Sequence, residues 1–138
     1  MIIKQISVFL ENVSGRLAEV TKILAAGQVN LRAMTIADTA DFGILRIITA
    51  HPDKAAEVLT RAGFMAKQTD VLAVEVEDRP GGLAHVLEIF SKNKVNIEYM
   101  YASLERSQDK AVIVIKVEDV QRGVKIVEEN GLKPVNTF

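Results

Sequence analysis

The amino-acid sequence predicts an α+β protein of two similar domains, each an antiparallel sheet with two helices on one face. The first observation is an internal repeat, because residues 11–34 align with residues 77–100 without a gap and are identical at nine of 24 positions. The second is the same order of apolar patterns in both copies: strand, helix, strand, strand, helix, strand. A repeat of 66 to 68 residues is a whole small domain, since solenoid repeats are shorter and more numerous. We therefore expect domains over residues 1–70 and 71–138.

In the first copy, mixed apolar and polar runs predict strands, and apolar residues three and four positions apart predict helices. The expected elements are a strand over residues 2–10, a helix over 17–27, hairpin strands over 31–37 and 42–50, a helix over 52–62 and a strand over 64–68. Pro52 suits the first position of its helix, and Gly63 suits a left-handed stop.

The second copy repeats this order. The expected elements are a strand over residues 71–78, a helix over 83–90, hairpin strands over 97–104 and 111–117, a helix over 119–130 and a strand over 132–135. Because crossovers between parallel strands are right-handed, the order predicts a ferredoxin-like sheet in each copy.

Burial requirements suggest that the two domains share an interface. A domain of roughly 65 residues buries only about 60% of its unfolded surface, so each half alone would be marginally stable. Residues 111–115 are apolar at every position, although a sheet covered on one face should alternate. Either the other face is an oligomer interface, as in a homodimer, or a few apolar residues simply face water.

Composition excludes several classes of function. With 17 basic and 18 acidic residues, no broad electrostatic surface for nucleic acid or an anionic membrane is expected. The strands at residues 44–48 and 112–116 carry no aromatic residue on which an RNA base could stack. Cysteine is absent, and no phosphate-binding or nucleophile motif occurs, so we expect no metal, no cofactor and no enzymatic activity. No apolar stretch is long enough to span a membrane, and the expected location is cytoplasmic.

The most informative local pattern is the turn before the first helix of each copy, ENVSGRLA and EDRPGGLA. A helix N-terminus presents unpaired N–H groups, and glycine there allows a carboxylate to approach the backbone. Asp78 or the oxygen of Asn12 could accept a hydrogen bond from an ammonium group, which would suit a free amino acid. Alternatively, these two residues merely begin a helix, with Pro80 at an early helical position.

Two asparagines and two histidines have ordinary structural explanations. Asn30 and Asn96 each precede a strand, where asparagine tolerates a left-handed conformation; facing the other copy's turn is the functional alternative. His51 and His85 lie in different copies without a set of carboxylates, so we expect them to be surface residues.

The second copy resembles the ACT domain in VEVEDRPGGLAHVLEIFSKNKVNIEYMYAS, with its Asp-Arg-Pro-Gly turn and Val-Asn-Ile strand start. The first copy, SVFLENVSGRLAEVTKILAAGQVNLRAMTIA, is similar to the variant in regulatory domains of aspartokinase and of acetolactate synthase. The resemblance implies domains that pair side by side and bind an amino acid where two of them meet. The residues it implies are Asn12, Val13, Ser14, Gly15, Arg16, Leu17, Asn30, Leu31, Asp78, Arg79, Pro80, Gly81, Gly82, Leu83, Asn96 and Ile97.

The first copy departs from the family pattern, since Asn12, Val13 and Ser14 replace the acidic residue, the arginine and the proline. The two turns are therefore inequivalent. Because ACT domains usually modulate a catalytic domain, the resemblance implies allosteric regulation of a partner enzyme in trans. The alternative is a subunit that assembles an enzyme of amino-acid metabolism without binding a ligand.

Overall fold

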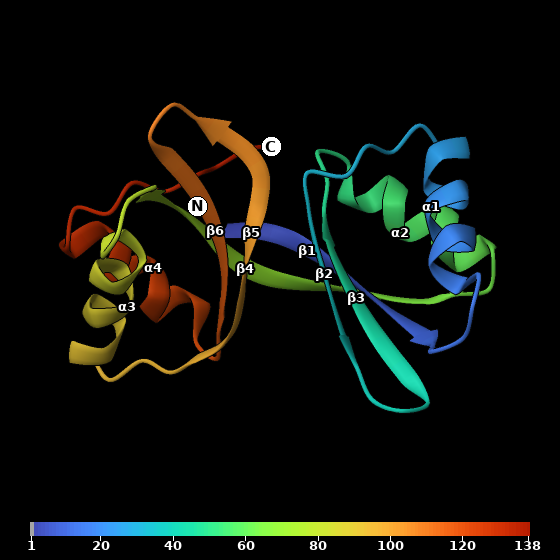
Figure 1. The fold of residues 1–138 in the computed structure, drawn as a ribbon, viewed down its shortest axis with the longest axis horizontal. Coiled ribbons are helices and arrows are strands. Elements are labelled where there is room, and N and C mark those ends of the chain that lie inside the picture. The colour runs from blue at the N-terminus through green and yellow to red at the C-terminus, as the bar shows by residue number, and fades with distance from the viewer. Residues whose placement is uncertain (1) are drawn as a thin grey trace. The chain divides into compact units, whose positions relative to one another are not determined.

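The computed structural model describes residues 2–138, apart from the side chains at positions 106 and 107 (Figure 1). The chain forms two compact units. The N-terminal unit consists of Lys4–Thr69 with Phe138, and the C-terminal unit consists of Asp70–Thr137 with Ile2 and Ile3. The expected domain limits, 1–70 and 71–138, stay a prediction.

The N-terminal unit contains an antiparallel sheet and two helices. Its elements are β1 (Ile2–Glu11), α1 (Arg16–Ala26), β2 (Ala33–Asp38), β3 (Phe42–Ile48), α2 (Pro52–Arg61) and the beginning of β4 (Met65–Glu77). Strand β3 lies between β1 and β2, so that Arg46 is opposite both Ser7 and Thr35. Pro52 is the first residue of α2, as its fixed φ angle and missing N–H favour.

The C-terminal unit repeats this arrangement. Its elements are the rest of β4, α3 (Gly82–Lys92), β5 (Ile97–Ser107), β6 (Lys110–Val117) and α4 (Val120–Glu129). Strand β6 lies between β4 and β5, with Val114 opposite both Ala73 and Tyr101.

The end of each copy differs from the sequence prediction. The strand expected at residues 64–68 is continuous with the next one, and together they form the 13-residue strand β4. The strand expected at residues 132–135 is only a single bridge between Pro134 and Val74. The N–H groups of Glu75 and Val135 still donate to the carbonyls of Lys133 and Ala73, at 2.8 Å each.

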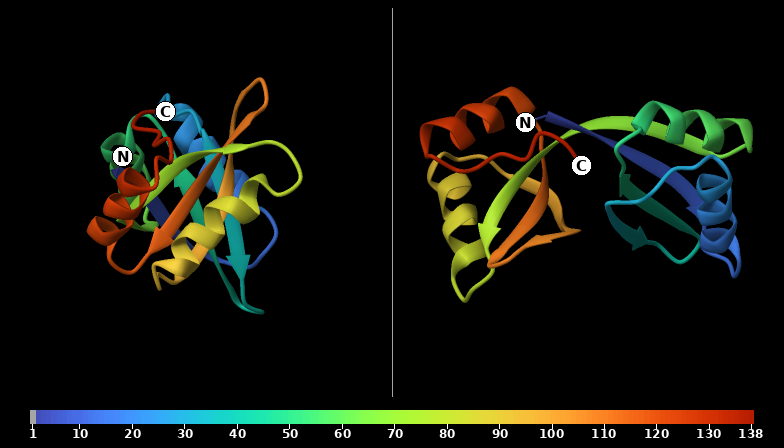
Figure 2. Two further views of the ribbon diagram at one scale, coloured as in Figure 1. Left: turned by 90° about the vertical axis from the view of Figure 1, so that its left-hand side faces the viewer. Right: turned by 90° about the horizontal axis from the view of Figure 1, so that it is seen from above.

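Both helices of each unit pack on one face of its sheet (Figure 2). In the N-terminal unit the alternating residues Ile6, Val8 and Leu10 of β1 share a core with Leu24 of α1 and Leu59 of α2. Residues two apart on a strand face the same side, so these contacts identify the covered face. The predicted α+β class with antiparallel sheets is thus confirmed.

The apolar run at residues 111–115 is at least half-buried at every position. Val112, Val114 and Ile115 are buried, whereas Ala111 and Ile113 are half-buried. None of these five apolar side chains is fully exposed, which agrees with the absence of polar residues from this part of β6.

Candidate functional site

The turns that precede α1 and α3 are held by equivalent hydrogen bonds, and we call residues 12–15 turn 1 and residues 78–81 turn 2. In turn 1 the N–H of Asn12 donates to the carbonyl of Asp41 at 2.9 Å. In turn 2 the N–H of Asp78 donates to the carbonyl of Asp109 at 2.7 Å. Each turn is therefore fixed to the hairpin loop of its own unit.

Each helix begins after a glycine in the left-handed region of backbone space. Gly15 has φ 91° and Gly81 has φ 85°, and neither helix start receives a hydrogen bond from a capping side chain. No heavy atom among the described residues, chain neighbours apart, lies within 4 Å of where a Cβ would stand at either glycine. The N–H of the first helical residue donates to a carbonyl of its turn, but the next two N–H groups lack partners within the helix, so both starts are open to a ligand there.

The idea that Asn12 and Asp78 merely cap the helices is wrong, since the N-cap residues are Gly15 and Gly81. The side chain of Asn12 instead donates from Nδ2 to the carbonyl of Thr39 at 3.1 Å, which ties turn 1 to the β2–β3 loop. Pro80 precedes the cap and does not occupy the first helical position.

Beside turn 2, the glutamate at the end of β4 pairs with two basic side chains. Arg79 donates a hydrogen bond from Nε to Glu77, and the Nζ of Lys110 lies 3.6 Å from the same carboxylate. The Arg79 hydrogen bond, followed by the charges of Arg79 and Lys110, holds the pKa of Glu77 below its usual range. Glu77 is therefore an anion at neutral pH.

In turn 1, the arginine comes from a different position. Arg16, the first residue of α1, lies 2.9 Å from Glu19 and 3.6 Å from Glu11, the equivalent of Glu77. The hydrogen bond to Glu19 is the main cause that raises the pKa of Arg16. The equivalent of Arg16 in α3 is Gly82, so both units pair this strand-end glutamate with arginine, but from different sites.

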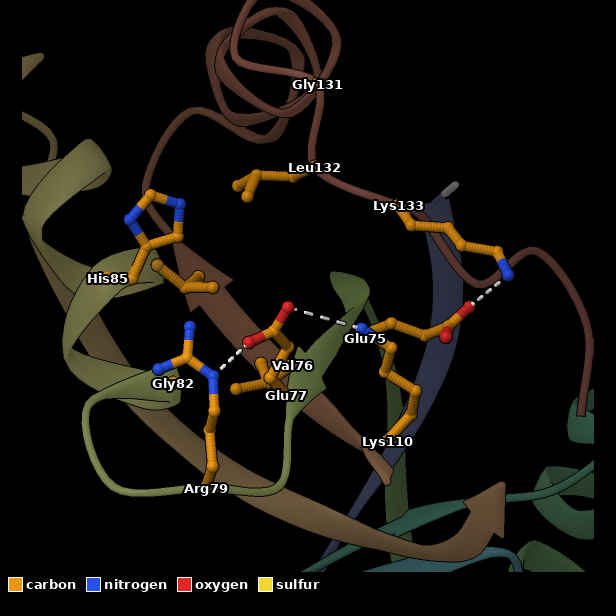
Figure 3. A pocket seen from close by; sticks show the side chains of 11 residues that line it. Glu75, Val76, Glu77, Arg79, Gly82, His85, Lys110, Gly131, Leu132 and Lys133 are labelled. Carbon is orange, nitrogen blue, oxygen red and sulfur yellow. Dashed lines mark hydrogen bonds and ion pairs between the residues drawn. The ribbon is translucent and has the colours of Figure 1, made fainter. Parts of the chain in front are cut away.

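A cleft of about 330 Å³, which we call cleft 2, opens beside turn 2 (Figure 3). It is lined by Glu75, Val76, Glu77, Arg79, Gly82, His85, Val86, Lys110, Gly131, Leu132 and Lys133. Lys133 Nζ lies 2.7 Å from Glu75, and Glu77 lies between Arg79 and Lys110. Three basic and two acidic side chains give this cleft a net charge of +1 with His85 neutral.

The same place in the N-terminal unit holds a cleft of about 350 Å³, which we call cleft 1. It is lined by Phe9, Leu10, Glu11, Arg16, Glu19, Phe42, Ala62, Gly63, Phe64 and Met65. The equivalent pairs across the repeat are Phe9 and Glu75, Phe42 and Lys110, Phe64 and Leu132, and Met65 and Lys133. The two copies have thus kept the cleft and changed its polarity.

The residues implied by the resemblance do not all meet within one unit. Asn30 and Asn96 are exposed and follow the C-terminal ends of α1 and α3, about 16 Å of helix away from turns 1 and 2. Leu31 and Ile97 pack against the cores of their units. The expectation that these asparagines adopt a left-handed conformation is wrong.

The left-handed residues in these connections are Gln28 and Lys94, each two positions before the asparagine. Each lies directly after the helix end, where the chain reverses and the positive φ is required.

Four of the implied residues line or border the clefts: Arg16 in cleft 1, Arg79 and Gly82 in cleft 2, and Asp78 in an adjoining hollow with Asp109. Val13 and Leu17 are exposed apolar residues of turn 1 and α1. Sequence analysis missed Glu75, Lys110 and Lys133. Aligning the two copies beyond the helix-start turns would have found them, because each replaces a Phe or Met of the first copy.

Among residues 2–138, no cluster of three or more His, Cys, Asp or Glu side chains could hold a metal ion, as far as side chains are described. No helix in the described part of the chain is long and apolar enough to cross a membrane.

Comparison with known proteins identifies the family. The family model for an ACT domain pair matches residues 1–137. Protein BT0572 from Bacteroides thetaiotaomicron is 41% identical, with a TM-score of 0.91, over 98% of this chain and 92% of that one. The ligand-free regulatory subunit of aspartate kinase from Thermus thermophilus has a TM-score of 0.65 at 16% identity, over 92% and 91% of the two chains.

The corresponding subunit from Thermus flavus has a TM-score of 0.63 at 17% identity, over 91% and 90% of the chains, and shares the fold. No curated protein matches the chain. The match to residues 1–137 confirms the resemblance seen in the two turns: the chain belongs to the ACT domain family and carries a pair of ACT domains.

Proposed function

We propose that this protein is a regulatory protein that binds a free amino acid and acts on a partner enzyme in trans. The observation that carries the proposal is cleft 2, in which charged groups of both signs surround an uncapped helix start. A free amino acid has one anionic and one cationic pole, so it needs both kinds of partner close together.

The two poles have separate partners at turn 2. The carboxylate would approach the first N–H groups of α3, where the helix dipole favours negative charge and Gly81 leaves the space open. The ammonium group would approach the carboxylates of Glu75 and Glu77, displacing part of their contact with Lys133 and Lys110. Turn 2 offers more charged groups than turn 1 for this purpose.

We further propose that each ACT domain has the ferredoxin-like arrangement and that the domains pair side by side. Within one unit, Asn96 lies about 16 Å of helix from turn 2. It can contact the ligand only where another domain supplies the turn. A homodimer in the cytoplasm would provide such junctions between domains, which is where the family resemblance places the ligand.

The proposal of action in trans comes from proteins that share this fold. The Thermus proteins with this fold are described as regulatory subunits of aspartate kinase. By analogy, the partner proposed for this chain is a separate catalytic protein of amino-acid metabolism.

The test is thermal unfolding in the presence of each of the twenty amino acids at millimolar concentration. A ligand at about 100 times its dissociation constant adds about 2.7 kcal/mol, which raises the midpoint by several degrees. We expect a selective shift that is lost in Arg79→Ala. The control is Arg61→Ala, which removes an exposed arginine paired with Glu57 in α2. No shift with any amino acid would favour a ligand-independent assembly subunit instead.

A further inference from the structure

Cleft 1 carries apolar side chains that the fold does not require. Phe9, Phe42 and Met65 are 43%, 60% and 70% exposed, so they contribute little to the core of the N-terminal unit. In cleft 2 the equivalent positions hold Glu75, Lys110 and Lys133, and the first two lie on strands paired as their counterparts are.

Because the second copy folds with charged residues at these positions, packing does not explain the aromatic ones in the first copy. Exposed apolar side chains gathered at one cleft mark a binding surface.

The size and lining of cleft 1 suit a small ligand. Its volume of about 350 Å³ lies in the lower part of the range of ligand pockets, roughly 300–1,000 Å³. Such pockets are lined mainly by apolar and aromatic side chains, with a few polar groups that orient the ligand. Cleft 1 has this composition, whereas cleft 2 is mainly charged.

The polar side of cleft 1 consists of three side chains in a row. Arg16 contacts Oε1 of Glu11 through one terminal nitrogen and Oε2 of Glu19 through the other. Two carboxylates against one guanidinium give a net charge of −1, which favours an ammonium group. Arg16 has five N–H donors, and those not directed at the glutamates can bind a carboxylate.

From these observations we infer that cleft 1 is a second ligand site, for an amino acid with an aromatic or branched apolar side chain. The side chain lies against Phe9, Phe42 and Met65, and the two charged poles face the row of Glu11, Arg16 and Glu19. The inference rests on the proposed function in that the ligand is a free amino acid, but it assigns the two clefts different ligands.

The test is calorimetric titration with L-phenylalanine and L-leucine as probes and L-glutamate for comparison. Phe42→Lys installs the residue found at the equivalent position of cleft 2. It should lower the affinity for whichever of L-phenylalanine and L-leucine binds the unaltered protein by at least tenfold. Met65→Lys, which likewise installs the equivalent residue of cleft 2, should do the same and serves if Phe42→Lys folds poorly. The matched control is Leu104→Lys, which replaces a 65% exposed leucine outside both clefts and should leave affinity unchanged.

Three outcomes separate this inference from the proposed function. Probe binding that is weakened by Phe42→Lys and unaffected by Arg79→Ala supports cleft 1. In the second outcome, Arg79→Ala abolishes binding of an amino acid, whereas Phe42→Lys and Met65→Lys leave its affinity unchanged. This result overturns the inference and leaves the proposed function standing. Absence of binding by all twenty amino acids overturns both.

Discussion

Turn 1 and turn 2 share a backbone and differ in the side chains built on it. Both are tied to a hairpin loop, and both end in a left-handed glycine with open space around it. Yet the arginine beside the strand-end glutamate comes from α1 in one unit and from the turn itself in the other. The comparison teaches that the repeat kept the backbone that exposes the helix start and varied the groups that select a ligand.

The largest difference between the turns is expected at the first helical residue. A Cβ on Gly82 would stand 2.0 Å from the carbonyl oxygen of Glu77, a backbone atom that cannot rotate away. The equivalent residue, Arg16, has a side chain. Its N–H donates to the carbonyl of Val13 at 3.4 Å, whereas the N–H of Gly82 donates to the carbonyl of Arg79 at 3.0 Å. The hydrogen bond that closes turn 1 is thus longer at the residue that carries a side chain.

We therefore expect Gly82→Ala to lower the free energy of unfolding by about 3 kcal/mol, because a backbone shift is required. Arg16→Ala, at the equivalent position, should lower it much less, because ion pairs at the surface contribute little to stability. Urea unfolding of both variants measures the difference. Equal effects would mean that a Cβ at residue 82 meets no more resistance than the one already present at residue 16.

The next largest effect is expected at the left-handed glycines, where the two turns have the same conformation. Gly15→Ala and Gly81→Ala each place a Cβ on a residue with φ near +90°, which should cost about 1–2 kcal/mol at both sites. Because neither Cβ would meet a neighbour, the two losses should agree within about 0.5 kcal/mol. Thermal unfolding of the pair provides the measurement. A much larger loss at one site would reveal a contact that distinguishes the turns.

A smaller effect is expected where the two cores differ by one methyl group on a helix and by the branching of a strand residue. Gly123 of α4, which faces Leu72, is equivalent to Ala55 of α2, and Leu72 is equivalent to Ile6. A Cβ on Gly123 would lie 2.5 Å from Cδ1 of Leu72, so Gly123→Ala should cost about 1 kcal/mol.

The control is the double variant Gly123→Ala with Leu72→Ile, which recreates the pair found in the N-terminal unit. It should recover at least about 0.5 kcal/mol relative to the sum of the single changes, because the residues contact each other. Additive losses in urea unfolding would show that the two cores are not interchangeable at this layer.

Helices and hairpins could be predicted from sequence because their signals are local. Pro52 marked the start of α2, and apolar spacing located α1 and α3. The fusion into β4 was not predicted, although residues 64–78 contain no glycine or proline that would separate two strands. The charged lining of cleft 2 was missed because Lys110 and Lys133 are distant in sequence from turn 2, and only the sheet brings them beside it.

The smallest effect concerns the charge of turn 2. The pKa of Glu77 is lowered first by the Arg79 hydrogen bond and then by the charges of Arg79 and Lys110, so Arg79→Ala should raise it more than Lys110→Ala does. NMR titration of the Glu77 carboxyl group measures both. Since the folded pKa lies below the ordinary value of 4.5, the stabilisation is present above that pH and is lost as pH falls through the folded pKa. A larger rise in Lys110→Ala would mean that the hydrogen bond is absent in solution, and the arginine of turn 2 would then be free to face a ligand.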